Sequence, residues 1–172
     1  MALTFDDFCH IYGKNYKFIR KALSSCVILT AFIPMLMDTG GNSGGQASVT
    51  IIRSMSLDDV QMRDVLKVIW KELRVAIYCG VTLALANFIK MMIIDRQSII
   101  AANQDPFMVS FVVCVTMLVT VIIAKLIGCS LPMLAKKIGF DPAVMASPFI
   151  TTVVDAISLF VYFNIASSIL PL

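Results

Sequence analysis

Residues 75–94 read VAIYCGVTLALANFIKMMII, an apolar run in which Lys90 is the only charged side chain. A helix needs about 20 mostly apolar residues to cross the hydrocarbon core of a bilayer. The run has that length, and Lys90 near its end can extend its ammonium group to the membrane interface. Hydrophobic residues make up 59% of the 172-residue chain and charged residues only 15%, which is too apolar for an ordinary soluble domain. We therefore predict an integral membrane protein.

Three further apolar stretches lie on either side of this run. Residues 107–127 and 145–170 are long enough to cross, whereas residues 22–37 are short for a span unless their neighbours extend it. Residues 47–74 are amphipathic and charged, which predicts a solvated loop followed by an interfacial helix. Leu131-Pro132 and the basic pair Lys136-Lys137 are expected to mark the interfacial exit of the third span. The predicted fold is all-α, a polytopic helical membrane protein with about four to five membrane helices.

The N-terminal residues 1–21 differ in character from the rest of the chain. Aromatic side chains alternate there with lysine and arginine, which is typical of a helix lying on the membrane surface. We therefore divide the chain into an amphipathic interfacial segment, 1–21, and a transmembrane domain, 22–172. The positive-inside rule would place residues 47–74 in the cytoplasm and both termini outside, but the basic N-terminal stretch favours the opposite arrangement. The charge pattern leaves the orientation open.

Charge and cysteine content argue against several other classes of protein. The net charge is +3, and the basic residues alternate with acids instead of forming a patch, so no nucleic-acid partner is expected. The five cysteines form no CxxC pair and are expected to be free thiols. No nucleophile–base pair or redox motif is visible, so we do not expect an enzyme.

Asp155 is the most informative single residue, because it lies inside the last apolar stretch. A charged side chain at the bilayer centre costs at least about 2.5–3.5 kcal/mol on insertion scales, which makes Asp155 a candidate for a functional role. Thr151, Asp155, Ser158 and Tyr162 follow the spacing i, i+4, i+7 and i+11, which places them in one polar stripe along a helix. The stripe is predicted to line a water-filled ion path; the alternative is polar packing between helices.

The glycine-rich run at residues 38–46 is the second notable feature. Four glycines within residues 40–45 predict that the backbone unwinds or turns there, exposing carbonyl and amide groups. Asp38 precedes the glycines and could attract cations to a pore mouth. The alternative is an ordinary surface loop at the end of the first span.

A single Asp155 is a sparse site for a divalent ion. Mg²⁺ retains much of its water shell and binds few protein carboxylates, so one or two acids with hydroxyl and amide oxygens suit a partly hydrated ion. A twofold homodimer with the ion path on its axis would pair two Asp155 side chains.

Two motifs carry a resemblance to a known family. Residues 34–46, PMLMDTGGNSGGQ, followed by Arg53, and the run from Asp141-Pro142-Ala143 to Asp155 resemble the MgtE magnesium transporters. The family pattern is a proline, an apolar stretch and GGNxGxQ, then DPA and an aspartate in the last membrane helix. The resemblance covers roughly residues 25–170.

The resemblance implies a homodimeric, multi-pass cell-membrane protein whose pore moves Mg²⁺, with Mn²⁺ and other divalent cations left open. Residues 22–172 would form the cation-transport domain, with a pore lined by the helix before the glycine motif and by the last helix. If the family's roles apply to the matching residues, Asp155 is the pore carboxylate and Thr151 lies one turn earlier in the pore. Asn42 would lie at the pore-lining end of the glycine segment, and Asp38 is an additional candidate ligand. We expect the chain to correspond to the family's transmembrane domain without the cytoplasmic Mg²⁺-sensing region.

Three functions are compatible with these residues. The first is a passive Mg²⁺ channel, and the second is an exchanger that couples Mg²⁺ to Na⁺ or H⁺. The third, from a different class, is a membrane scaffold that transports nothing and whose polar stripe serves dimer packing.

Overall fold

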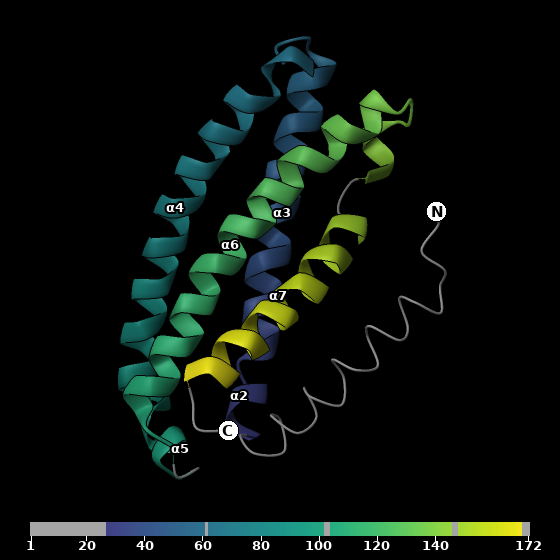
Figure 1. Cartoon of the computed structure of the whole chain (residues 1–172). Coiled ribbons are helices and arrows are strands. Elements are labelled where there is room, and N and C mark those ends of the chain that lie inside the picture. The colour runs from purple at the N-terminus through teal and green to yellow at the C-terminus, as the bar shows by residue number, and fades with distance from the viewer. Residues whose placement is uncertain (1–26, 61, 102–103, 146–147, 170–172) are drawn as a thin grey trace, which may run out of the picture.

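Helix α6 (Pro106–Lys137) is the central helix of a bundle of long helices in the computed structural model, which describes residues 27–60, 62–101, 104–145 and 148–169 (Figure 1). It begins where the Asp105 side chain accepts a hydrogen bond of 2.9 Å from the Phe107 amide, with Pro106 in its first turn. The other elements, in chain order, are α2 (Val27–Thr30), α3 (Ile33–Ser56), η1 (Met62–Asp64), α4 (Val65–Lys90), the π-helical turn η2 (Met91–Asp95), α5 (Arg96–Ala101), η3 (Pro142–Met145) and α7 (Pro148–Ile169).

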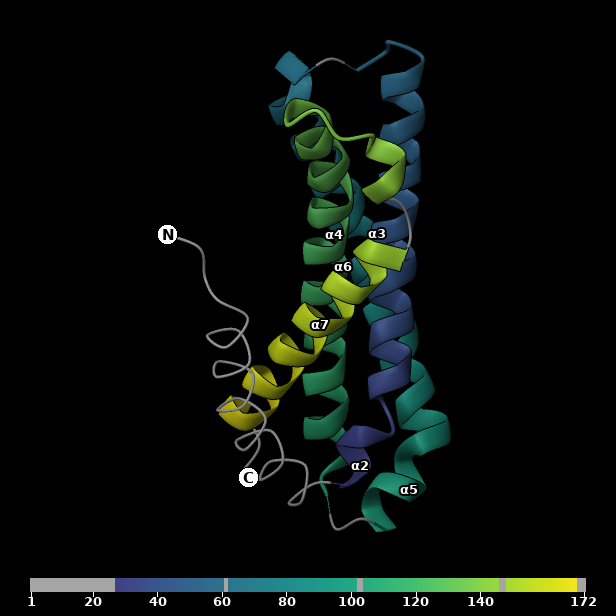
Figure 2. The same cartoon turned by 90° about the vertical axis from the view of Figure 1, so that its right-hand side faces the viewer.

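The long helices alternate in direction along the bundle. Helix α3 runs from the end that carries α2 to the opposite end, α4 returns, α6 runs back and α7 returns again (Figures 1 and 2). Helix α3 packs against α6 and α7, whereas α4 packs against α6, with at most marginal contacts to the other long helices. Helix α6 therefore separates α4 from α3 and α7.

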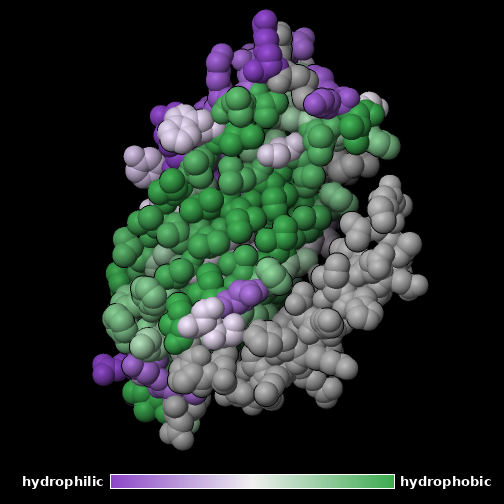
Figure 3. All heavy atoms as spheres, in the orientation of Figure 1, coloured by the Kyte–Doolittle hydropathy of each residue, from purple (hydrophilic) through white to green (hydrophobic). Residues whose placement is uncertain are grey.

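Three described segments are long and apolar enough to span a membrane: Val65–Ala101, Pro106–Lys137 and Pro148–Ile169. This confirms the all-α polytopic membrane fold. Figure 3 shows the matching surface, a broad hydrophobic band with hydrophilic residues at both ends of the bundle. The predicted interfacial segment, 1–21, lies outside the described residues.

The glycine-rich run does not unwind, so that prediction was wrong. Residues 33–56 form one continuous helix, α3, and the charged loop expected from residue 47 onward begins only after Ser56. Glycine costs about 1 kcal/mol in an exposed helix interior. Here that cost is offset because α3 approaches α6 closely: a Cβ on Gly128 would overlap the Gly44 carbonyl oxygen and lie 3.0 Å from the Gly44 Cα.

The third span was expected to exit at Leu131-Pro132 and Lys136-Lys137. Helix α6 continues past the buried Pro132 and ends at Lys137. Proline lacks an amide hydrogen, so it removes one hydrogen bond from the helix, but membrane helices tolerate such a loss when neighbouring helices pack around it. Gly139, with φ of 85°, lies just beyond the end of α6 in the left-handed conformation that favours glycine.

Buried side chains join the helices at both ends of the bundle. One cluster surrounds α2, α5 and the last turns of α7, and it comprises Leu29, Phe32, Leu36, Met91, Ile99, Val109, Val112, Val113, Met117, Tyr162, Phe163 and Ala166. A second cluster joins α3, α4 and α6 at the opposite end and comprises Ile51, Met55, Val68, Cys129 and Met133. The three described cysteines are free thiols, as expected, but Cys79 is exposed and only Cys114 and Cys129 are buried.

An ion pair connects α4 to α6. Lys125 Nζ lies 3.5 Å from Glu72 Oε2, and each side chain is only 11% exposed. Because little water reaches this pair, removing one partner would leave a buried charge uncompensated.

Candidate functional site

The close contact between α3 and α7 positions the candidate site. A Cβ on Gly41 would lie 3.2 Å from Thr151 Cγ2 and 3.7 Å from Asp155 Oδ1, so the absence of a side chain on α3 makes room for two polar residues of α7. Thr151 and Asp155 are one turn apart and both are half-buried. Two of the predicted site residues are thereby held against the glycine segment.

The outward face of α3 carries the other two. Asp38 and Asn42 are exposed, and the Asn42 Nδ2 donates a hydrogen bond of 3.0 Å to Asp38 Oδ1. Gln46 and Thr50 continue the same face at intervals of four residues, also exposed. Thr50 Oγ1 donates to the Gln46 carbonyl at 2.9 Å, which fixes its side chain along the helix. The result is a continuous polar stripe along one side of α3.

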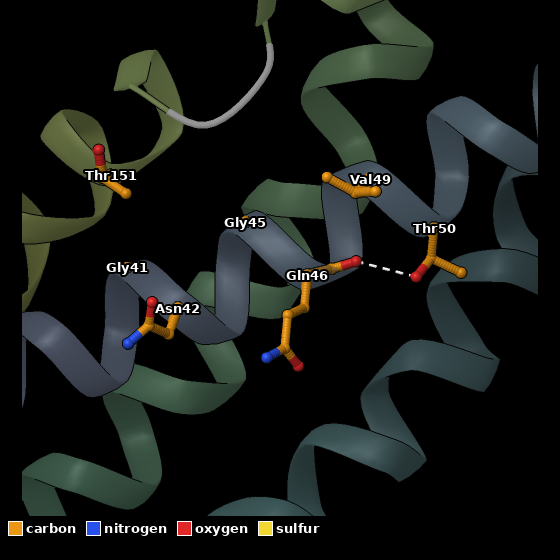
Figure 4. Close-up of a pocket in the computed structure, with 7 residues that line it drawn as sticks. All are labelled: Gly41, Asn42, Gly45, Gln46, Val49, Thr50 and Thr151. Atoms are coloured by element: carbon orange, nitrogen blue, oxygen red, sulfur yellow. Dashed lines mark hydrogen bonds between the residues drawn. The ribbon is translucent and has the colours of Figure 1, made fainter.

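A groove of about 460 Å³ runs along this stripe (Figure 4). It is lined by Gly41, Asn42, Gly45, Gln46, Val49, Thr50 and Thr151. Thr151 donates a hydrogen bond of 3.0 Å to the Pro148 carbonyl, which leaves its oxygen lone pairs available as acceptors. Amide and hydroxyl oxygens from two helices therefore face one open space.

The two carboxylates lie at the margin of the groove. Asp155 approaches the groove wall at Gly41 on the side of α7. Asp38 lies one turn before Asn42 on α3 and accepts its hydrogen bond. Two of the predicted site residues therefore lie where α3 and α7 meet, and the other two lie on the adjoining outward face of α3.

Two of the four residues in the polar stripe predicted on α7 are covered by other parts of the bundle. Ser158 is 2% exposed and bonds its own helix at the Val154 carbonyl, while Tyr162 is fully buried and its hydroxyl donates to the Leu29 carbonyl at 3.0 Å. Helix α3 and the cluster around α2 cover this half of the stripe. Ser158 and Tyr162 are therefore packing residues in this structure and do not face a water-filled path.

The ligands in the groove also differ in kind from those expected of an unwound segment. Because α3 is helical throughout the glycines, its carbonyls bond within the helix, and side chains supply the free oxygens. Within the described ranges no group of three or more His, Cys, Asp and Glu side chains could hold a metal ion. The site is a sparse set of oxygen donors, the type that Mg²⁺ and Ca²⁺ prefer over softer metals.

Gln46 and Thr50 were not anticipated as site residues. The signal was present, since Asp38, Asn42, Gln46 and Thr50 recur every four residues. These four residues share one face of α3 only if the glycine run is helical, and that run was expected to unwind.

Comparisons with known proteins identify a family that matches this chain. The model of the MgtE family, described as divalent cation transporter, matches residues 33–165. Magnesium transporter MgtE of Bacillus subtilis is 30% identical over 162 residues, covering 92% of this chain. Its counterparts in Thermus thermophilus and Enterococcus faecalis are 30% and 33% identical and cover 88% and 84% of this chain. The chain spans about a third of the length of these relatives: 33%, 31% and 30% respectively.

Proposed function

Because the chain belongs to the MgtE family of divalent cation transporters, we propose that it moves divalent cations, above all Mg²⁺, across the membrane. In this proposal two copies of the chain face each other across a twofold axis, and α3 and α7 of each copy line the ion path between them. The role is transport, with no catalysed reaction.

The observation that carries the proposal is the exposed polar face of α3. Asp38, Asn42, Gln46 and Thr50 lie uncovered on a helix that packs against two apolar spans, α6 and α7. Polar and ionised groups facing lipid are costly, and in membrane proteins they almost always face a water-filled cavity or another protein surface. A second copy placed against this face would enclose the stripe and the groove. It would provide both a protein surface and a water-filled cavity for the polar side chains to face.

The dimensions of the groove suit a hydrated ion. A Mg²⁺ with six waters at about 2.1 Å measures roughly 7 Å across, or roughly 180 Å³ as a sphere. The groove on one copy, about 460 Å³, has room for such an ion. Asp155, Asp38 and the oxygens of Asn42 and Thr151 would then accept hydrogen bonds from its bound waters, with the carboxylates of two copies supplying the charge.

Mg²⁺ uptake into liposomes tests the role of Asp155. We expect Asp155→Ala to lower uptake at least about tenfold, because it removes the carboxylate nearest the groove wall. Asp59→Asn is a matched control: it removes an exposed carboxylate in the α3–α4 connection and is expected to leave uptake unchanged. Cross-linking in the same liposomes measures the dimer. Unchanged uptake by Asp155→Ala contradicts the proposed site, and a lost dimer with unchanged uptake per protein favours the scaffold.

The same liposomes separate a channel from an exchanger. A passive path needs only a Mg²⁺ gradient, whereas a coupled exchanger needs an opposing Na⁺ or H⁺ gradient. We propose the passive path, and uptake that stops when the Na⁺ and pH gradients are removed would contradict it.

A further inference from the structure

The outward side of α4 carries a group of basic and aromatic residues that the proposed ion path does not use. Lys67, Trp70, Lys71 and Arg74 are all exposed, and Trp70 is 61% exposed. They fall at intervals of three and four residues, so they share one side of the helix. We refer to these four residues as the α4 basic patch.

Two cations of this patch have no carboxylate partner among the described residues. Lys67 lies 3.2 Å from Asp64, and the nearby Glu72 is buried and paired with Lys125. Lys71 and Arg74 make no ion pair within the described part of the chain. They therefore present uncompensated positive charge beside Trp70, within the next turn of α4.

The surroundings of the patch point to lipid as its partner. Helix α4 lies on the outside of the bundle and packs against α6, so no other long helix among the described residues covers its outward side (Figure 1). Below the patch the same side becomes apolar, and its large exposed side chains are Tyr78, Val81, Leu85, Ile89 and Ile93. Tryptophan and basic residues above an apolar helix face are typical of the level where lipid headgroups lie.

We propose that the α4 basic patch binds the headgroups of anionic phospholipids. The lipid phosphate would lie against Lys71 and Arg74, Trp70 would occupy the headgroup–acyl boundary, and the acyl chains would follow the apolar side of α4. Anionic lipids attract basic residues close to the membrane surface, and two uncompensated cations correspond to a preference of about thirtyfold over zwitterionic lipids. This binding surface lies across α6 from the groove and does not depend on the proposed ion path.

Trp70 provides the assay, because it is the only tryptophan of the chain. The protein is reconstituted in phosphatidylcholine with increasing fractions of phosphatidylglycerol whose acyl chains are brominated, and bromine quenches the Trp70 fluorescence on contact. Quenching against mole fraction gives the preference for phosphatidylglycerol at this surface. We expect a preference of about thirtyfold for the wild type and a value near one for Lys71→Gln/Arg74→Gln.

A matched control keeps the net charge equal to that of the test variant. Lys136→Gln/Lys137→Gln removes two exposed cations at the same end of the bundle, on α6, and is expected to keep the wild-type preference. Lys71→Arg/Arg74→Lys conserves the charge and should also keep it. A wild-type preference near one, an equal loss in the α6 variant, or a Trp70 that brominated phosphatidylglycerol does not quench at any mole fraction would overturn the proposal. The last result would mean that protein covers the patch.

Discussion

The close approach of α3 and α6 predicts opposite effects for the same substitution at two glycines. At Gly128, an added methyl group would meet the Gly44 backbone, which cannot rotate aside as a side chain can. Overpacking costs about 1–3 kcal/mol, and a backbone neighbour places this case near the upper end. The better helix propensity of alanine recovers about 1 kcal/mol. The net loss of stability for Gly128→Ala is therefore about 2 kcal/mol.

Gly45→Ala is the matched comparison, because a Cβ at Gly45 would meet nothing within 4 Å. Only the higher helix propensity of alanine remains, so the free energy of unfolding of this variant should rise by about 1 kcal/mol. For a chain of this size, 1 kcal/mol corresponds to about 2–4 °C in the unfolding midpoint. We expect Gly128→Ala to unfold about 4–8 °C below the wild type and Gly45→Ala about 2–4 °C above it.

Thermal unfolding of the monomeric, detergent-solubilised chain, followed by circular dichroism at 222 nm, measures both values. Detergent micelles and scan rate are kept identical, so the difference between the two variants reports the local space at each glycine. A Gly128→Ala midpoint equal to or above that of the wild type would refute the argument, since it would mean that α3 and α6 separate at no cost.

Two further predictions concern contacts within the bundle. Tyr162→Phe removes the hydrogen bond to the Leu29 carbonyl and should cost about 1 kcal/mol, measured as a lower unfolding midpoint; an unchanged midpoint would mean that this bond contributes nothing. Glu72→Ala leaves Lys125 buried without its partner and should cost about 3 kcal/mol, whereas Glu72→Leu/Lys125→Met should recover most of that loss. Equal stability of the single and double variants would contradict a buried ion pair.

The sequence was sufficient to predict the membrane class and the helical fold, because both depend on local composition. The runs at residues 75–94 and 107–127 needed only length and hydropathy. Their ends were less predictable: α6 continues beyond Pro132, since the proline is buried among neighbours that only the tertiary structure supplies. Local propensity gave the wrong answer for α3 for the same reason, because the benefit of each glycine depends on a helix far away in the sequence.

The candidate site was predicted in outline, and its limits follow from the same distinction. Spacing placed Thr151 and Asp155 on one face of α7, and the structure brings both to the groove. Spacing could not tell that Ser158 and Tyr162, further along that face, would be covered by α2 and α3. A periodic pattern defines which residues share a side of a helix, but what packs against that side is a property of the whole bundle.

The position of α6 has a consequence for how this chain can vary between species. Helix α4 meets the bundle on one side of α6, and α3 and α7 meet it on the other. Mutations on the outward side of α4 can therefore accumulate, and adapt the protein to membranes of different composition, without altering the groove. Substitutions on helix α6 are more restricted, because a change of side-chain volume on either of its sides disturbs the packing of a neighbouring helix.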